Sequence, residues 1–413
     1  MQKKVVLVIL TLAGILGYFS LKNVNDENNL ELLGTYIDGV YSENIPSKSE
    51  GYVVDKIECD NAATGVWDYD KWGLLVSNMS KKSKCNIYFK KGIRLADTIT
   101  LVDTSGKCPT VNDDGTINVT GAESDNSLLC MAPDDYGTSY YFRGNVSNNY
   151  VKFANFYWRI IRVNGDGSVR MIYDGTEAHE NSDSSSDKLI GKSWFNNSKD
   201  DNAYMGYMYG IAGVSTYAET HKNINDSAAK IYIDSWYENN IKETPAEKYL
   251  SDNIFCNDRS FAKNNTGTGA GQSVTYYRWG NNLPNDNTDI VLKCLQQNDA
   301  FTVNDTTLGN GNLKYKIALP TADEVTLAGA YDGENTSYYL YNQEYNWTMS
   351  AALYGKSDTG QSSNVCWHRT FHYSSGLNDF TTYSQAGVKT VINLKAGSLK
   401  FGDGTMNNPY KVE

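Results

Sequence analysis

The chain has 413 residues, enough for roughly two or three domains of ordinary size. Its hydrophobic fraction of 40% supports a folded core and excludes a wholly disordered chain. The formal net charge is −11, which argues against nucleic acid as a partner because phosphate binding needs a basic face. Tyrosine is frequent, with 31 residues, and its rigid ring with a polar tip suits both sheet edges and half-exposed binding faces.

The N-terminus carries the pattern of an export signal. Lys3 and Lys4 precede an apolar run from Val5 to Leu21, a pattern that directs export with the N-terminus kept inside. The run of about 17 residues is at the lower limit for crossing a bilayer, and no small-x-small cleavage site is evident. We therefore expect residues 1–22 to form an uncleaved anchor helix that holds an extracytoplasmic protein at the cell surface. A cleaved signal peptide, which would give a secreted protein, and a buried core helix are the alternatives.

Three regions are expected between the anchor and the large domain. Residues 23–33 are polar and predict a stalk. Residues 34–92 alternate short strand-like runs with turns, which predicts a small β-sandwich that needs a covalent link for stability. Residues 93–138 are rich in Asp, Asn, Gly, Ser and Thr and predict a connector.

Seven cysteines without a CxxC spacing indicate disulfides rather than a zinc ribbon or a thioredoxin-type site. In an exported chain, disulfides are the default. Spacing does not fix connectivity, but pairing each cysteine with its neighbour in the chain gives three candidate bridges, Cys59–Cys85, Cys108–Cys130 and Cys256–Cys294. Cys366 is then the one left over.

A large domain is expected over residues 139–413. Two apolar, aromatic runs, 156–163 and 168–173, flank Asn164-Gly165-Asp166-Gly167, which is a typical hairpin turn composition. These runs predict a pair of antiparallel strands. Residues 388–394 are a candidate buried strand near the end of the chain.

Two helices are expected in this domain. The first covers about 227–241, where apolar residues recur near helical spacing and Asp226 or Ser227 can cap the start. The second follows Thr321, which forms a capping box with Glu324, and Gly329 is expected to end it. The long polar segments between the elements, such as 257–287, are typical of binding loops or clipped insertions.

Several segments of this domain resemble known families. LPTADEV (319–325), YNWTMS (345–350) and GVKTVINLK (387–395) resemble the late signature of C-type-lectin-like folds related to the formylglycine-generating enzyme. YYFRG, FYWRIIRVNGDGS, SWYENN and GDGTMNNPY are similar to segments of uncharacterised exported proteins from low-GC Gram-positive bacteria. Lys389-Thr390 departs from the signature, which has Arg-Pro there.

The resemblance implies a fold for the region from residue 139 to the end. It implies a C-type-lectin-like domain with two helices and a loop-rich face that carries the function. The whole chain is then expected to be α+β, with an N-terminal anchor helix, a small β-sandwich and this larger domain.

The sequence offers two weak metal-site candidates. His368 and His372 are spaced i, i+4 beside Cys366, as ligands on a helix would be, but CWHRTFHYSSG favours a strand or loop with partly exposed contact residues. Asp286 with Asp289, and Asp332 with Glu334, lie in segments that lack a complete calcium loop and are explained by turn chemistry. We therefore expect no metal and no cofactor.

Residues 362–385 are the most informative segment for function. They concentrate aromatic, Arg, His and Asn residues in a short polar stretch, and Trp, Tyr and Arg dominate the energetics of binding surfaces. The expected ligand-binding residues are Trp367, His368, Arg369, Phe371, His372, Tyr373, Asn378, Phe380 and Tyr383.

The composition of this segment also resembles the variable region of target proteins of diversity-generating retroelements, which use the same fold. One hypothesis is therefore a hypervariable binding patch at 362–385. The alternatives are a fixed binding surface of the same shape and aromatic side chains that simply pack against the hairpin.

These observations favour a cell-surface receptor or adhesin for a glycan or protein ligand rather than an enzyme. No nucleophile elbow, zinc-protease motif or phosphate loop is present in the sequence. An enzyme of the formylglycine-generating or glycosidase type and a structural envelope protein remain as alternatives, since a pair of glycosidase carboxylates leaves no sequence motif.

Overall fold

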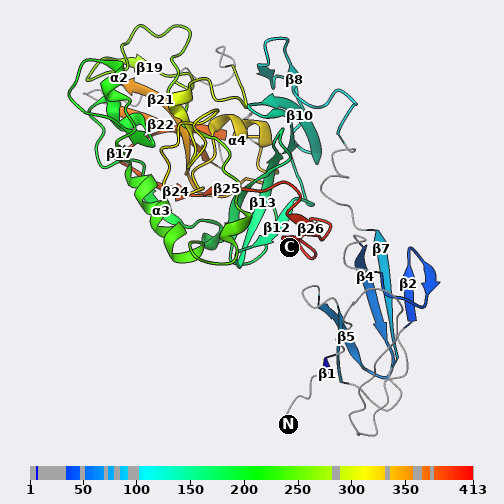
Figure 1. Cartoon of the computed structure of the whole chain (residues 1–413). Helices are drawn as coiled ribbons and strands as arrows, with labels where there is room; N and C mark the ends of the chain where they lie inside the picture. Colours follow the sequence, from blue (N-terminus) through cyan, green and yellow to red (C-terminus); the bar gives the residue numbers. More distant parts are fainter. Residues whose placement is uncertain are drawn as a thin grey trace. The chain divides into compact units, whose positions relative to one another are not determined.

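The computed structural model describes residues 6–7, 34–46, 52–68, 73–78, 84–91, 102–280, 289–330, 335–356, 365–372 and 376–412. The chain divides into two compact units (Figure 1). The first comprises Met1–Arg94 with Phe401–Asp403, and the second comprises Leu95–Lys400 with Gly404–Glu413. Sheets dominate the described residues, with three short α-helices, which confirms an α+β chain of low helical content.

The expected anchor and stalk fall almost wholly outside the described residues. Within 1–22 only Val6–Leu7 are described, and they form a strand, β1, that pairs antiparallel with β6 (Gly73–Ser77). None of the helices in the described ranges is long and apolar enough to cross a membrane.

The first unit contains two sheets that share one core. One sheet has the order β3-β2-β7-β4 and the other β1-β6-β5. Their bounds are β2 (Gly34–Ile37), β3 (Val40–Ser42), β4 (Tyr52–Cys59), β5 (Thr64–Asp68) and β7 (Cys85–Lys91). Trp67 and Leu74 from one sheet pack with Ile87 and Phe89 from the other. Cys59–Cys85 joins directly paired positions of β4 and β7, so the predicted bridge is confirmed.

The main sheet of the second unit has eight strands. Its order is β10-β11-β13-β12-β27-β26, and β14 pairs both with β13 and with β25. The strands are β10 (Leu128–Asp134), β11 (Gly137–Arg143), β12 (Tyr150–Phe153), β13 (Phe156–Val163), β14 (Val169–Gly175), β25 (Val391–Leu394), β26 (Leu399–Phe401) and β27 (Tyr410–Val412). Their buried side chains belong to the largest core of the chain.

The predicted hairpin is confirmed as β13 and β14, which pair antiparallel around Asn164–Ser168. The segment 93–138, expected to be a connector, contributes strand β10 to the main sheet. Cys130 lies on β10 and is bridged to Cys108, as predicted. Leu129 and Cys130 are buried there, so this part of the segment is held by core packing as well as by the bridge.

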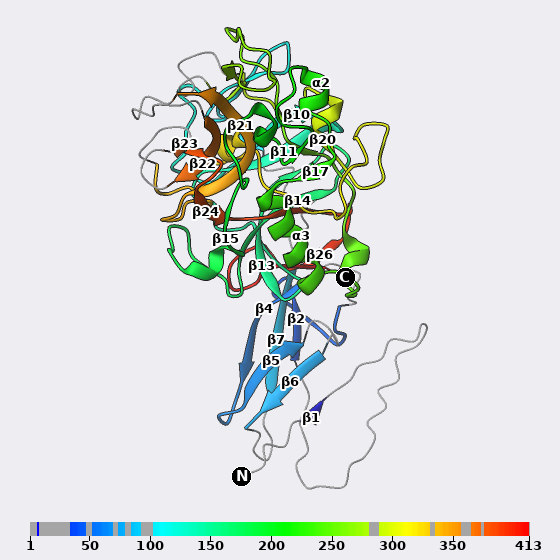
Figure 2. The same ribbon diagram turned by 90° about the vertical axis from the view of Figure 1, so that its left-hand side faces the viewer.

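A second sheet in this unit carries the segment expected to bind ligand. Its order is β15-β24-β21-β22-β23, with β19 pairing β21, and Figure 2 shows β21, β22 and β23 side by side. The strands are β15 (Gly191–Trp194), β19 (Thr275–Tyr276), β21 (Asn346–Gly355), β22 (Val365–His372), β23 (Gly376–Thr381) and β24 (Gln385–Val388). Every residue of β21 is buried, which makes it the centre of the sheet.

Both predicted helices are confirmed together with their caps. α3 covers Ala228–Asn240, and Ser227 Oγ accepts from the backbone N–H of Lys230. α4 covers Ala322–Ala328, has the complete Thr321–Glu324 capping box and ends at Gly329.

Shorter elements complete the second unit. The strands are β8 (Thr110–Val111), β9 (Ile117–Asn118), β16 (Met208–Tyr209), β17 (Asn225–Asp226), β18 (Phe255–Cys256) and β20 (Ala300–Phe301). The helix α2 covers Tyr217–Thr220, and four 3-10 turns cover Ser186–Lys188, Asn202–Met205, Glu247–Tyr249 and Gln297–Asp299. Cys256 on β18 is bridged to Cys294, which confirms the third predicted disulfide.

The single strand expected over 388–394 is two strands in two sheets. β24 ends at Val388 and pairs with β15, whereas β25 begins at Val391 and pairs with β14. The break falls at Lys389-Thr390, where both side chains are buried. At this break Lys389 Nζ lies 3.3 Å from Asp174 Oδ1, and Thr390 Oγ1 donates to the carbonyl of Ala318.

Candidate binding face

The backbone of the predicted binding segment forms an antiparallel hairpin, β22–β23. Trp367, His368 and Arg369 lie on β22 opposite Thr381, Phe380 and Asp379 of β23, respectively. The side chains of these three β22 residues and of His372, and all of Tyr373, lie outside the described residues.

The described side chains of this hairpin are largely packed. Phe371 is 1% exposed and belongs to the main core together with Leu377, its partner on β23. Phe380 is half-buried, and its ring centroid lies 4.2 Å from that of Tyr345. Asn378 is also half-buried, and its carbonyl accepts from Thr370 Oγ1. The packing of Phe371 agrees with the alternative in which some aromatic residues support the hairpin.

Tyr383 differs from these residues because it is exposed and stacks on a second exposed aromatic ring. It is 50% exposed, and the Trp194 side chain is 39% exposed. Their centroids are 5.6 Å apart with an interplanar angle of 4°, so the two rings are parallel. The pairing of β15 with β24 brings them together, since Trp194 lies directly opposite Gln385.

Polar side chains adjoin this aromatic pair. Lys192 lies two residues before Trp194 on the same outward face of β15 and forms an exposed ion pair with Glu344 at 2.8 Å. Gln385, opposite Trp194, is exposed as well. We call Trp194, Tyr383, Gln385, Lys192 and Glu344 the aromatic patch. Rigid aromatic area beside polar groups is the usual composition of a recognition surface.

Sequence reasoning identified Tyr383 but missed Trp194. The signal present was a tryptophan in the polar run GKSWFNNSKDD, but the adjacent Phe195 gives the same signal and is a buried core residue. The alternation of β15, with Lys192 and Trp194 outward, is too short to be recognised in the sequence.

Metal binding by the two candidate histidines is disfavoured by their backbone. His368 and His372 both lie on strand β22, and residues four apart on a strand are separated by about 13 Å, too far to share one ion. Among the described residues no group of three or more His, Cys, Asp or Glu side chains could hold a metal. Of the calcium candidates, Asp289 is described and pairs with Lys263 at 2.9 Å, whereas Asp286, Asp332 and Glu334 lie outside the described residues.

Cys366 is a buried thiol. It is fully buried on β22, and its Sγ donates to the carbonyl of Asp201 at 2.9 Å. Burial raises its pKa well above the ordinary value, and the charge of Asp201 adds to the effect. Since the thiolate is the reactive form of cysteine, this environment suits an inert core residue rather than a nucleophile.

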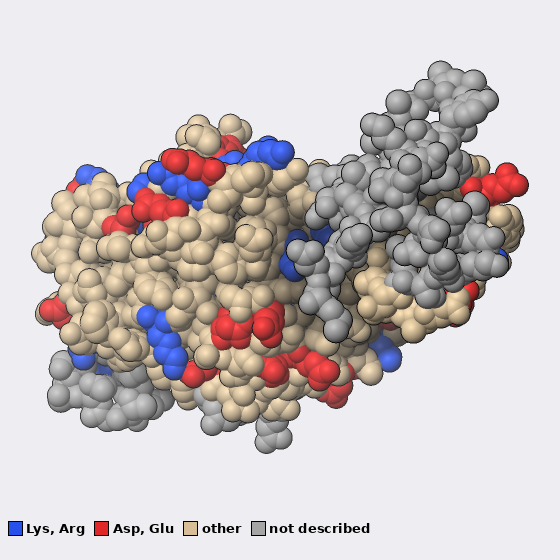
Figure 3. Space-filling view, turned by 90° about the horizontal axis from the view of Figure 1, so that it is seen from below, with Lys and Arg blue, Asp and Glu red and all other residues tan. Residues whose placement is uncertain are grey.

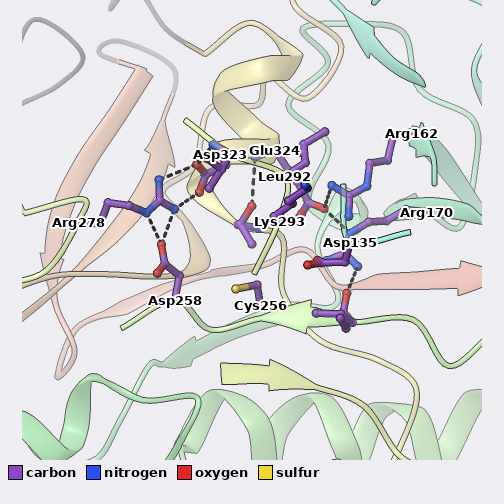
Figure 4. A pocket seen from close by; sticks show the side chains of 13 residues that line it. Asp135, Arg162, Arg170, Cys256, Asp258, Arg278, Leu292, Lys293, Asp323 and Glu324 are labelled. Carbon is purple, nitrogen blue, oxygen red and sulfur yellow. Dashed lines mark hydrogen bonds and ion pairs between the residues drawn. The ribbon is translucent and has the colours of Figure 1, made fainter. Parts of the chain in front are cut away.

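A small cavity of the second unit, of about 20 Å³, is lined by opposite charges (Figure 4). Arg278 bridges Asp258 and Asp323, and Arg170 pairs with Glu324. A volume of this size holds about one water molecule. The charges pair with one another around the first turn of α4, and the volume leaves no room for an organic ligand.

The described surface carries mixed charges. On the face drawn in Figure 3, Lys and Arg side chains occur in small groups between Asp and Glu, and no broad basic area is visible there. Three disulfides indicate folding in an oxidising environment. Comparisons with protein-family models, curated proteins and solved structures found no match to this chain.

Proposed function

We propose that this is an extracytoplasmic, membrane-anchored binding protein whose second unit is a C-type-lectin-like domain that recognises glycans. The stacked, exposed Trp194–Tyr383 pair carries this proposal. The export signal and the three disulfides support the proposed extracytoplasmic location. The capped helix α4 and the buried Trp347 strand lie where the resemblance to the lectin-like signature expects a helix and a strand.

The chemistry of the aromatic patch favours a carbohydrate over a hydrophobic peptide. The C–H face of a pyranose ring stacks on an aromatic ring, and its hydroxyl groups require donors and acceptors at the edge of that ring. Gln385, Lys192 and Glu344 can supply them. A peptide anchor would instead need a deep apolar pocket, whereas the Trp194–Tyr383 stack is exposed and lies beside polar side chains.

Replacing Trp194 or Tyr383 by alanine is expected to weaken glycan binding about five- to thirtyfold. Each change removes one ring of the exposed stack, and loss of a central aromatic contact typically costs about 1 to 2 kcal/mol. Binding of the purified extracytoplasmic part would be measured first on a glycan array and then by calorimetry with the best sugar.

Tyr41→Ala is the matched control, because Tyr41 is an exposed tyrosine, 58% accessible, that belongs to the first unit. It should bind like the unchanged protein. Equal affinity of all three variants for every glycan bound would contradict the assignment of the patch, provided that each variant unfolds at the same denaturant concentration.

We further propose that residues 362–385 vary between copies of this gene while the rest of the domain is constant. Sequencing the gene from many cells of one population should then show substitutions concentrated at adenine-bearing codons of this window. Changes at Phe371 and Cys366 should be rare, because both side chains are buried in the core. An invariant window would refute the hypervariable form of the proposal and leave a fixed binding surface.

A further inference from the structure

One buried carboxylate of the second unit is surrounded by three buried cations. Asp174, at the end of β14, lies 3.3 Å from Lys389 Nζ through its Oδ1 atom. Lys188 Nζ lies 3.9 Å from the same oxygen, and Arg159 lies 3.9 Å from Oδ2. The four side chains are at most 1% exposed. Three positive charges therefore meet a single negative charge in the interior.

Arg159 has hydrogen-bond partners outside this cluster, whereas one oxygen of Asp174 and the amine of Lys188 have no hydrogen-bond partner among the described residues. The guanidinium donates to Asn149 Oδ1, Asn181 Oδ1 and the carbonyl of Val146. Asp174 Oδ2 and Lys188 Nζ make no hydrogen bond within the part of the chain that the structure describes. A buried ion pair offsets its desolvation only when its remaining polar atoms are hydrogen-bonded, so this cluster is poorly explained as a plain salt bridge.

Two acidic groups near the cluster, Asp183 and Asp187, attract the charge of Lys188, and both also contact His179. The segment after β14 brings His179, Asp183 and Asp187 toward Lys188. His179 contacts Asp187 at 2.9 Å and Asp183 at 3.5 Å. Asp187 also accepts from the backbone N–H and the hydroxyl of Thr176.

These surroundings raise the fraction of neutral amine on Lys389 above that of an ordinary lysine. Burial lowers the pKa of Lys389 to about 8, and the neighbouring Lys188 and Arg159 charges oppose the attraction of Asp174. In roughly a tenth of the molecules Lys389 is then unprotonated near neutral pH, a far larger fraction than for an ordinary lysine. An unprotonated amine beside a carboxyl group is a nucleophile placed at its electrophile.

We propose that Lys389 and Asp174 form an intramolecular amide bond. In the reacting pair, one proton of the Lys389 ammonium moves to an oxygen of Asp174, so that Nζ carries a free lone pair and the oxygen that will leave carries a proton. Nζ then attacks Cγ. One carboxyl oxygen leaves as water, taking one proton from the amine and one from the protonated carboxyl group. One C–N bond forms, one C–O bond breaks, and no oxidant or reductant is required.

The two other cations assist this step. Arg159 and Lys188 both lie near the carboxyl oxygens, on which negative charge develops in the tetrahedral intermediate. Fixed positive groups in a dry site stabilise such an oxyanion. The product would link β14 covalently to the junction between β24 and β25 across 215 residues of sequence, and reducing agents would not cleave it.

Mass spectrometry of the unaltered protein tests the proposal directly. After reduction of the disulfides and denaturation, the chain should be lighter than its sequence by the mass of one water molecule. Protease digestion should yield a branched peptide that contains both Asp174 and Lys389, and the two linear peptides should be missing. Separate, unlinked Asp174 and Lys389 peptides from folded protein would overturn the proposal.

Variants identify the reacting groups. Asp174→Asn should still form the bond but lose ammonia instead of water, whereas Asp174→Ala and Lys389→Met should both retain the full mass. Lys188→Met should slow bond formation without abolishing it. A bond that persists in Lys389→Met and disappears in Lys188→Met would overturn the assignment of Lys389 as the nucleophile.

Discussion

Glu324→Gln is expected to lower the free energy of unfolding of the second unit by about 3 to 5 kcal/mol, the usual effect of breaking a buried ion pair from one side. Glu324 Oε1 pairs with Arg170 and lies 3.4 Å from Arg162. Its other oxygen accepts from the backbone N–H of Thr321 in the capping box. Glutamine keeps the shape and can still accept this bond, but it leaves the buried guanidinium of Arg170 without its paired carboxylate.

The pKa of Arg170 supports the size of this effect. Burial lowers that pKa to about 10, even though Glu324 raises it. The folded state therefore already opposes the charge on Arg170, and removing its carboxylate partner makes that cost larger.

Equilibrium unfolding in urea, followed by tryptophan fluorescence, measures the change. Glu219→Gln is the matched control, since Glu219 pairs with Lys222 on the surface, where the side chains are 41% and 49% exposed. It should change the free energy of unfolding by less than about 1 kcal/mol. Comparable effects of the two substitutions would show that the arginines relax to other partners or to water.

Local signals explain why much of the fold was predictable from the sequence. The capping box of α4, the Ser227 cap of α3 and the turn between β13 and β14 each depend on a few consecutive residues. The three disulfides also join cysteines that are neighbours in chain order. Such features depend on residues that are close in the sequence, so they can be predicted from the sequence itself.

Features that depend on distant pairings were not predictable. Trp194 meets Tyr383 only because β15 pairs with β24, and Asp174 meets Lys389 only because β14 pairs with β25. Neither register leaves a recognisable pattern in strands of this length. The break at Lys389-Thr390 was missed for the same reason, since nothing in the local sequence shows that the lysine is buried.

The interior of the second unit also contains more charge than sequence rules suggest. Arginine and lysine are almost never fully buried unless paired. Yet the largest fully buried side chains include Arg143, Arg159, Arg170 and Arg259. Arg143 donates to the carbonyls of Thr326 and Leu327 at the end of α4, where the helix leaves acceptors unpaired. Composition alone would have assigned these residues to the surface.

Acid is expected to destabilise the second unit through His221. Burial, reinforced by the charge of Arg259, lowers the pKa of His221 to about 2, compared with 6.5 in the unfolded chain. Its Nε2 lies 3.0 Å from the carbonyl of Gly269, and Nδ1 has no hydrogen-bond partner among the described residues. Protonation would therefore bury a charge together with an unpaired donor.

The direction in which stability changes with pH follows from proton binding. Between pH 6.5 and about 2 the unfolded chain binds a proton at His221 that the folded chain excludes, so stability falls as the pH decreases through this window. From about pH 6 to about pH 5, the histidine should contribute a loss of roughly 1 kcal/mol in the free energy of unfolding. The loss should continue at lower pH, because the folded-state pKa lies far below the range used.

His221→Gln separates this contribution from that of the carboxylates. Glutamine can donate to the Gly269 carbonyl and does not titrate, so the variant should lose less stability than the unchanged protein between the two pH values. Urea unfolding at each pH gives the difference directly, and the carboxylates contribute equally to both proteins. Parallel losses in the two proteins would mean that the His221 site admits a proton without cost, through water entry or local opening of the segment that carries Gly269.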